Sequence, residues 1–112
     1  MTTKFAMTRD VNGYNGFGLI PAEDKYSTTL AATVAQTFTV PDNFQNWIAV
    51  FSFEPGSSVW VAHNTTATLP GGSVASSVSE LNPTVWQVKG GDTISAISNN
   101  TTAEIGVKFY AL

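Results

Sequence analysis

The stretch Thr84–Tyr110, TVWQVKGGDTISAISNNTTAEIGVKFY, decides the fold of this chain. Residues 89–92 (KGGD) form a turn sequence, since glycine tolerates the positive φ of short hairpin turns. Residues 99–102 (NNTT) form a second one, because asparagine tolerates the left-handed region and bonds its own backbone. Every second residue from Ile105 to Phe109 is apolar, the pattern of a strand with one face in a core. The stretch therefore predicts three β-strands joined by two tight reversals.

The composition is that of one globular domain without disulfides or a membrane span. The chain has 112 residues, 43% of them hydrophobic and 12% aromatic, which excludes a disordered chain. No run approaches the roughly 20 apolar residues of a membrane helix. The N-terminal residues MTTKFAMTRD lack the apolar core of a signal peptide, so we expect the protein to fold where it is made. Without cysteine, stability must come from packing or assembly.

The charge balance argues against nucleic acid as a partner. Eight acidic against five basic side chains give a net charge of −3, with no basic cluster for a phosphate backbone. The charged fraction of 12% is about half the usual level, and serine and threonine fill the polar positions instead. Such a surface suits close packing against other subunits, and the alternative is a neutral surface of no significance.

Residues 1–27 predict an N-terminal arm and loop, and residues 28–112 predict a β-sandwich domain. The arm has no steady period, but turn dipeptides precede a short strand around residues 17–20, which Pro21 ends. The AEDKYS segment that follows is predicted to be a loop. Such an arm either lies on its own core or docks on a neighbour. Its large apolar residues are Tyr14, Phe17, Leu19 and Ile20.

Two further segments carry strand patterns. The alternation from residue 28 to residue 40 predicts one strand, long enough that we expect a kink or break in it. Asn46–Phe53, NWIAVFSF, is apolar on both faces, which requires a cover on both. Ile48 and Val50 face away from the tryptophan side, and in a two-layer sandwich their cover must be the arm or another chain.

The remaining segments complete an all-β fold. Residues 54–57 (EPGS) predict a type II turn and a hairpin between the preceding strand and Ser58–His63. Ser73–Leu81 fits a helical spacing almost as well as a strand, and we favour an irregular edge strand. The count of seven or eight strands without a helix predicts an antiparallel β-sandwich or jelly-roll-like fold. The predicted core consists of Leu30, Val34, Phe38, Trp47, Phe51, Val59, Val61, Trp86, Val88, Ile94, Ile105, Val107 and Phe109.

The sequence offers no catalytic or metal-binding constellation. His63 is the only histidine, and a single histidine among scattered carboxylates is more often structural than a ligand or base. We therefore expect no catalysis, metal or cofactor, although a glycosidase-type pair of carboxylates stays open. Trp47, Trp60 and Trp86 could form a sugar-stacking platform, but all three lie within strand segments, which favours core or interface packing.

Several segments in this order resemble one class of protein. They are Val40-Pro41-Asp42 at a strand end, NWIAVFSFEPGSSVWVAHN, SELNPTVWQVKGGDTISAIS and AEIGVKFYAL. Together they resemble small β-sandwich virion proteins of tailed bacteriophages, which decorate or cement capsids or form head or tail attachments. The resemblance covers residues 28–112 and rests on strand layout and the VKGGDTIS turn. The same turn between strands occurs in tumour-necrosis-factor-like jelly rolls, which are also trimers.

The resemblance implies a non-enzymatic virion component on the capsid surface, made in the host cytoplasm. Its implied partners are its own copies, most often in a trimer, and the major capsid protein or other shell subunits, without nucleic acid or membrane. The alternative is a receptor- or glycan-binding module of a phage fibre or spike, for which only Phe44 and Tyr26 qualify as loop aromatics. The residues expected at an oligomer or capsid interface are Tyr14, Phe17, Leu19, Ile20, Ile48, Val50 and Trp60.

Overall fold

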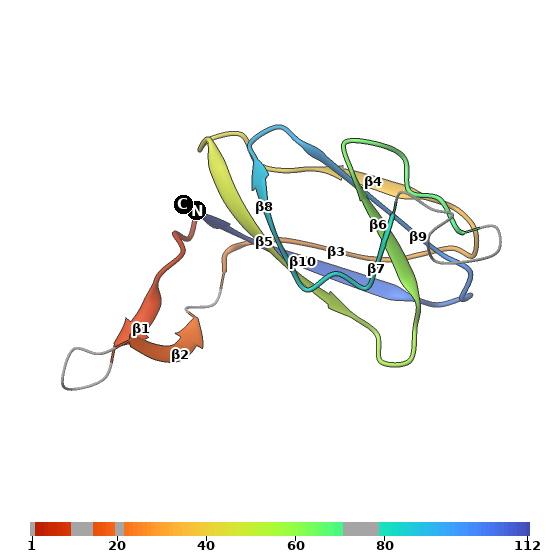
Figure 1. Ribbon diagram of the computed structural model, residues 1–112, viewed down its shortest axis with the longest axis horizontal. Coiled ribbons are helices and arrows are strands. Elements are labelled where there is room, and N and C mark those ends of the chain that lie inside the picture. Colours follow the sequence, from red (N-terminus) through yellow and green to blue (C-terminus); the bar gives the residue numbers. More distant parts are fainter. Residues whose placement is uncertain (1, 10–14, 20–21, 71–78) are drawn as a thin grey trace.

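Two four-stranded antiparallel sheets pack face to face in the computed structural model, which describes residues 2–9, 15–19, 22–70 and 79–112 (Figure 1). The first sheet has the order β3 (Asp24–Thr29), β10 (Glu104–Ala111), β5 (Asn46–Phe53) and β8 (Val85–Lys89). The second has the order β4 (Gln36–Thr39), β9 (Thr93–Ser98), β6 (Val59–His63) and β7 (Glu80–Leu81). No helix occurs in the described residues, so the predicted all-β sandwich is confirmed.

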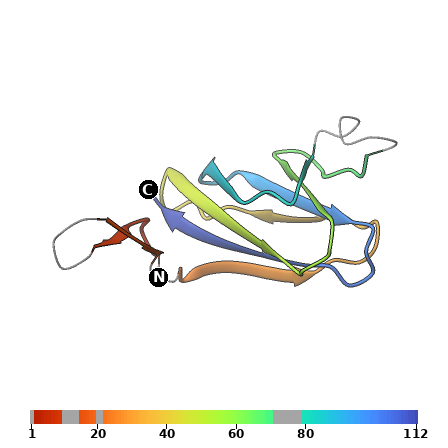
Figure 2. The same ribbon diagram turned by 60° about the horizontal axis from the view of Figure 1, so that its bottom comes forward.

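A further antiparallel pair of strands precedes the sandwich. It consists of β1 (Met7–Arg9) and β2 (Asn15–Leu19), and Figure 2 shows it beyond one end of the two layers. The second of these strands agrees with the short strand predicted around residues 17–20. The sandwich itself begins at β3, so the AEDKYS segment, predicted to be a loop, forms an edge strand instead.

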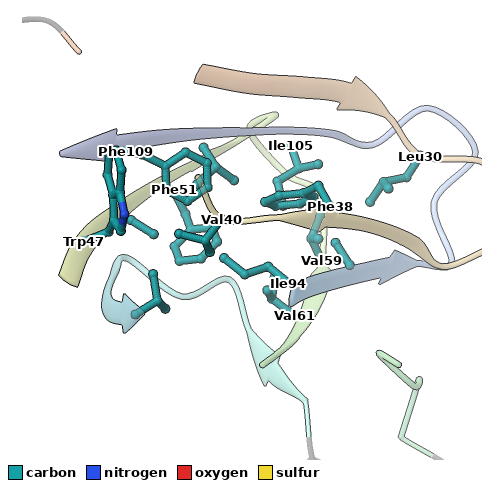
Figure 3. Close-up of a cluster of buried hydrophobic side chains, with 14 of the residues drawn as sticks. Leu30, Phe38, Val40, Trp47, Phe51, Val59, Val61, Ile94, Ile105 and Phe109 are labelled. Carbon is teal, nitrogen blue, oxygen red and sulfur yellow. The ribbon is translucent and has the colours of Figure 1, made fainter. Parts of the chain in front are cut away.

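The core lies between the two sheets and is built from the alternating inward residues of both (Figure 3). Trp47 and Ile94, from opposite sheets, are fully buried. The predicted core residues that are buried are Leu30, Phe38, Trp47, Phe51, Val59, Val61, Val88, Ile94, Ile105, Val107 and Phe109. Trp86 is half-buried and packs against this cluster. Alternation within strands therefore identified the buried faces correctly.

Val34 is the one predicted core residue that the structure places in solvent, with 49% of its surface exposed. The predicted long strand from residue 28 to residue 40 is in fact two strands in different sheets, β3 and β4. Between them the chain turns, with Thr33 at a φ of 61° and the Val34 amide donating to the Ala31 carbonyl at 3.2 Å. This turn interrupts the alternation and rotates Val34 outward.

The predicted tight reversals connect the two sheets rather than neighbouring strands. Residues 54–58 join β5 to β6, residues 89–92 join β8 to β9, and residues 99–103 join β9 to β10. In each case the chain leaves one sheet and enters the other, so the predicted hairpin between β5 and β6 is wrong. Turn composition shows where a chain reverses, whereas the ladder partner depends on which core face each strand covers.

The outer face of the second sheet carries a second apolar cluster. Trp60, Ala62 and Ile97 lie beneath Ala67 and Leu69 of the segment that follows β6. The Ala67 amide donates to the Ser95 hydroxyl at 2.9 Å, which fixes this segment on the sheet. Consequently β6 is covered on both faces by this chain alone.

Candidate interaction surface

The outer face of the first sheet carries an apolar patch. Trp47 and Ala49 of β5 point into the core, so Ile48 and Val50, which alternate with them, face outward and are half-buried. The ladder register places Tyr110 and Gln87 on either side of Ile48, and Lys108 and Val85 on either side of Val50. The apolar patch consists of Phe5, Ile48, Val50, Val85 and Tyr110.

Exposure is uneven across the apolar patch. Val85 is 50% exposed and Phe5 36% exposed, whereas Tyr110 is buried. A cluster of this kind on a sheet face is typical of a surface that another molecule covers, whereas single exposed apolar residues are ordinary.

The N-terminal segment covers part of this patch. Thr3 and Phe5 exchange backbone hydrogen bonds with Ala111, at 2.9 Å and 2.8 Å, so the segment lengthens the β3 edge of the first sheet. This pairing sets the Phe5 ring edge-on against Tyr110, with 6.3 Å between centroids. Ile48 and Val50, next to this covered position, remain half-buried. The cover predicted for this strand is therefore only partly supplied by the described arm.

A groove of about 580 Å³ adjoins the apolar patch on β3, β10 and β5, and we call it the polar groove after its serine, threonine and glutamate side chains, although Phe53, Pro55 and Ile105 also line it. Its floor is a row formed by Ser27, Gly106 and Ser52, which the ladders place side by side. Gly106 leaves the floor open, because a Cβ there would lie 2.8 Å from the Ser52 hydroxyl oxygen. Glu54 and Glu104 line one end of the groove. A glycine inside a strand often marks a place where a ligand or another backbone approaches closely.

Two lysines border both the polar groove and the apolar patch, because Lys108 lies directly beside Val50 and two residues from Gly106. Lys25 of β3 lies directly opposite Lys108 of β10, and both side chains are exposed on the outer face. Like charges in directly opposed positions destabilise a sheet. Among the described residues, neither ammonium group forms an ion pair with a carboxylate. This lysine pair holds two of the five basic residues of the chain.

His63 takes part in a hydrogen-bonded network at the β8–β9 turn. Its Nε2 donates to Asp92 Oδ2 at 2.7 Å, and the Lys89 amide donates to the same oxygen at 2.9 Å. Both bonds stabilise the carboxylate and lower the pKa of Asp92, the His63 bond contributing most. Asn64 extends the network, since its side-chain oxygen accepts from the Thr93 amide at 2.9 Å.

This network ties the end of β6 to the turn and does not assemble a recognisable reaction centre. No hydroxyl group of the described residues bonds to His63, so a nucleophile beside this base is missing from that part of the chain. The described residues also contain no group of three or more histidine, cysteine or acidic side chains able to hold a metal ion.

The other predicted interface residues are distributed differently from Ile48 and Val50. Trp60 is only 7% exposed and lies under Ala67 and Leu69, so it offers no contact surface in this chain. Phe17 and Leu19 belong to β2, and Tyr14 and Ile20 lie outside the described residues, as do residues 73–78 of the predicted edge strand.

The loop aromatics expected for a recognition module are also placed differently. Tyr26 is part of β3 and stacks on Phe38, with ring centroids 4.2 Å apart. Phe44 is half-buried, packs edge-on against Trp47 at 6.0 Å and lies beneath the Lys4 ammonium, 5.0 Å from its ring centroid. These rings are therefore engaged within the chain.

Sequence reasoning missed the polar groove and the lysine pair. The single available signal was Gly106 inside a strand of otherwise strand-forming residues. Comparison with protein-family models, curated proteins and solved structures gives no match. Over the described ranges, no helix has the length and apolar character needed to cross a membrane.

Proposed function

We propose that this protein is a non-enzymatic structural subunit of a bacteriophage virion, which forms a homotrimer and decorates or cements the capsid surface. The observation that carries the proposal is the apolar patch on the first sheet, where Ile48 and Val50 remain half-buried and Val85 half-exposed. Its partners would be its own copies and the major capsid protein. Neither nucleic acid nor membrane enters this function.

The connection order supports the jelly-roll-like fold that the sequence predicted, a fold that also suits a virion role. The sandwich has two four-stranded sheets, and successive strands switch between them at every step except from β6 to β7. Double-sheet jelly rolls of eight strands recur in viral capsid and lectin domains. Fold alone does not establish function, so the proposal depends on the surface rather than on this likeness.

The side chains of the apolar patch do not by themselves supply the binding free energy of a micromolar complex. Burying a large apolar side chain contributes about 1.5–3 kcal/mol, and the patch side chains are already partly covered. The four side chains of the patch other than the buried Tyr110 then give about 3–6 kcal/mol if each gains half of that value, which is below the roughly 8 kcal/mol of a micromolar complex. The surface of a second copy that faces the patch adds buried apolar area of its own to the contact between copies, and we assign the separate capsid contact to the β1–β2 pair, which lies beyond the end of the sandwich (Figure 2).

The oligomer is tested by light scattering on the purified protein at micromolar concentration. We expect the wild-type mass to be three times that of the chain, and Ile48→Asp to give monomers that keep the β-sheet circular dichroism spectrum. Val34→Asp is the matched control, because it places the same charge on an exposed apolar residue far from the patch. A wild-type monomer, or equal dissociation by both substitutions, would contradict the proposal.

The capsid contact has its own test. Deleting residues 7–19 removes β1 and β2 but keeps the Thr3 and Phe5 pairing with Ala111. We expect this variant to melt within a few degrees of wild type and to lose co-sedimentation with shells of the source phage that lack the protein. Unchanged co-sedimentation would show that the pair is not the capsid contact.

A further inference from the structure

The polar groove and the lysine pair point to a ligand-binding site beside the apolar patch. We propose that they bind an acidic saccharide, with its carboxylate at Lys25 and Lys108 and its hydroxyl groups in the groove. This inference does not depend on the capsid proposal, because it uses other residues of the same sheet.

The charges give the first reason. In a chain with only five basic residues and a net charge of −3, two lysines oppose each other across a ladder without a carboxylate partner in the described residues. That arrangement opposes folding, since each ammonium raises the energy of the other. A carboxylate bound between them would relieve this repulsion and form charge-assisted hydrogen bonds with both.

The groove gives the second reason. Residues two apart on a strand are separated by about 6.6 Å, so a group seated over Gly106 lies within reach of Lys108 on one side and Glu104 on the other. The floor offers the hydroxyls of Ser27 and of Ser52, whose Oγ donates to the Gly106 carbonyl at 3.4 Å and can still accept from a ligand. The far end offers the carboxylates of Glu54 and Glu104. Serine hydroxyls donate and accept, while carboxylates accept from ligand hydroxyls.

The lysine pair and the polar groove together favour one class of ligand. A simple anion would use the lysine pair and gain nothing from two carboxylates at the other end of the groove. A neutral sugar would use the hydroxyls and leave the lysine repulsion in place. A saccharide that carries one carboxylate and several hydroxyls matches both halves, and the groove volume of about 580 Å³ accommodates one or two sugar rings.

Nuclear magnetic resonance titration of the full chain tests the proposal. The probes are 3′-sialyllactose and a glucuronic-acid disaccharide, which separate the two common sources of sugar carboxylates, with lactose as the neutral control and sodium sulfate as the simple anion. We expect at least one acidic probe to shift the amide signals of Ser27, Ser52 and Gly106 with a dissociation constant of about 1 mM, and lactose to bind about tenfold more weakly.

Matched lysine variants sharpen the test. Lys25→Gln and Lys108→Gln should each weaken acidic-probe binding about tenfold, whereas Lys89→Gln, on β8 of the same sheet, should leave it unchanged. In the free protein, Lys25→Gln should also raise the melting temperature by about 1–4 °C, because it removes the repulsion. A lysine with only a structural role would not give these opposite effects on binding and stability.

Three results would overturn the proposal. The first is the absence of shifts with both acidic probes. The second is equal binding of lactose, and the third is reproduction of the same shifts by sulfate at equal concentration. Ser27→Val provides a further check, since valine is a good strand former that would fill the groove floor, and retained binding in this variant would place the ligand elsewhere.

Discussion

Alanine at Gly90 and at Gly91 should destabilise the protein for two different physical reasons. A Cβ on Gly90 would press on the Phe44 carbonyl oxygen and would lie 3.1 Å from Asp42 Cα. These are backbone atoms, so no flexible side chain can move aside. A Cβ on Gly91 would instead meet open space, but the φ of +87° at this residue is strained for any side-chain-bearing L-residue.

The expected loss of unfolding free energy differs between the two substitutions. Overpacking at Gly90 costs about 1–3 kcal/mol, and displacing its amide from the Gln45 carbonyl, now 2.9 Å away, costs about 0.5–1.5 kcal/mol more. We therefore expect Gly90→Ala to lower the free energy of unfolding by about 1.5–4.5 kcal/mol. Gly91→Ala should lower it by about 1–2 kcal/mol, from the left-handed conformation alone.

Urea unfolding followed by tryptophan fluorescence measures both values under the same conditions. Gly91→Ala serves as the control, because it changes the same turn by the same methyl group. The two variants should differ in the midpoint of unfolding and share one slope. Equal destabilisation of the two variants would refute the close approach between the β8–β9 turn and residues 41–44.

Three further substitutions test other parts of the structure. The pKa of Asp92 is held below 3.8 in the folded state, so its stabilising contribution is present above that pH and is lost as the pH falls through the lowered value. Asp92→Asn should remove this loss of stability at low pH, so the melting temperatures at neutral and strongly acidic pH should differ less than in the wild type. An unchanged difference would contradict the stabilising role of the carboxylate. Trp60→Ala should cost about 3–5 kcal/mol in urea unfolding, because the ring is buried under residues 64–70, and a cost typical of an exposed residue would disprove that cover. Val34→Thr should change the free energy of unfolding by less than about 0.5 kcal/mol, and a larger loss would indicate that Val34 is buried in the core.

The sequence was sufficient for the strand faces but not for the strand partners. Alternation is a local property, so it identified Trp47 as inward and Ile48 as outward, and both assignments hold. It did not show that β5 and β6 belong to different sheets, because that depends on contacts between residues far apart in the chain. The segment that covers Trp60 escaped prediction for the same reason, since it has no strand periodicity.

The sequence was likewise sufficient for one part of the candidate surface and not for the other. Ile48 and Val50 could be found from the sequence, because a strand that is apolar on both faces is unusual in a two-layer sandwich. The polar groove could not, because Ser27, Ser52 and Gly106 become neighbours only when three distant segments align in register. A like-charged pair such as Lys25 and Lys108 is likewise invisible until the ladder is known.

The central position of β10 has a consequence for how the chain acquires its structure. This strand pairs with β3 on one side and with β5 on the other, so neither partner completes its ladder until residues 104–111 have left the ribosome. Until then, the nascent first sheet exposes two unpaired edges with apolar faces, the kind of intermediate that aggregates and engages chaperones. With ladders that span such sequence separations, folding is expected on the millisecond-to-second timescale of other sandwich proteins. The first sheet is therefore completed only after β3, β5 and β8 have been made, once β10 inserts between β3 and β5.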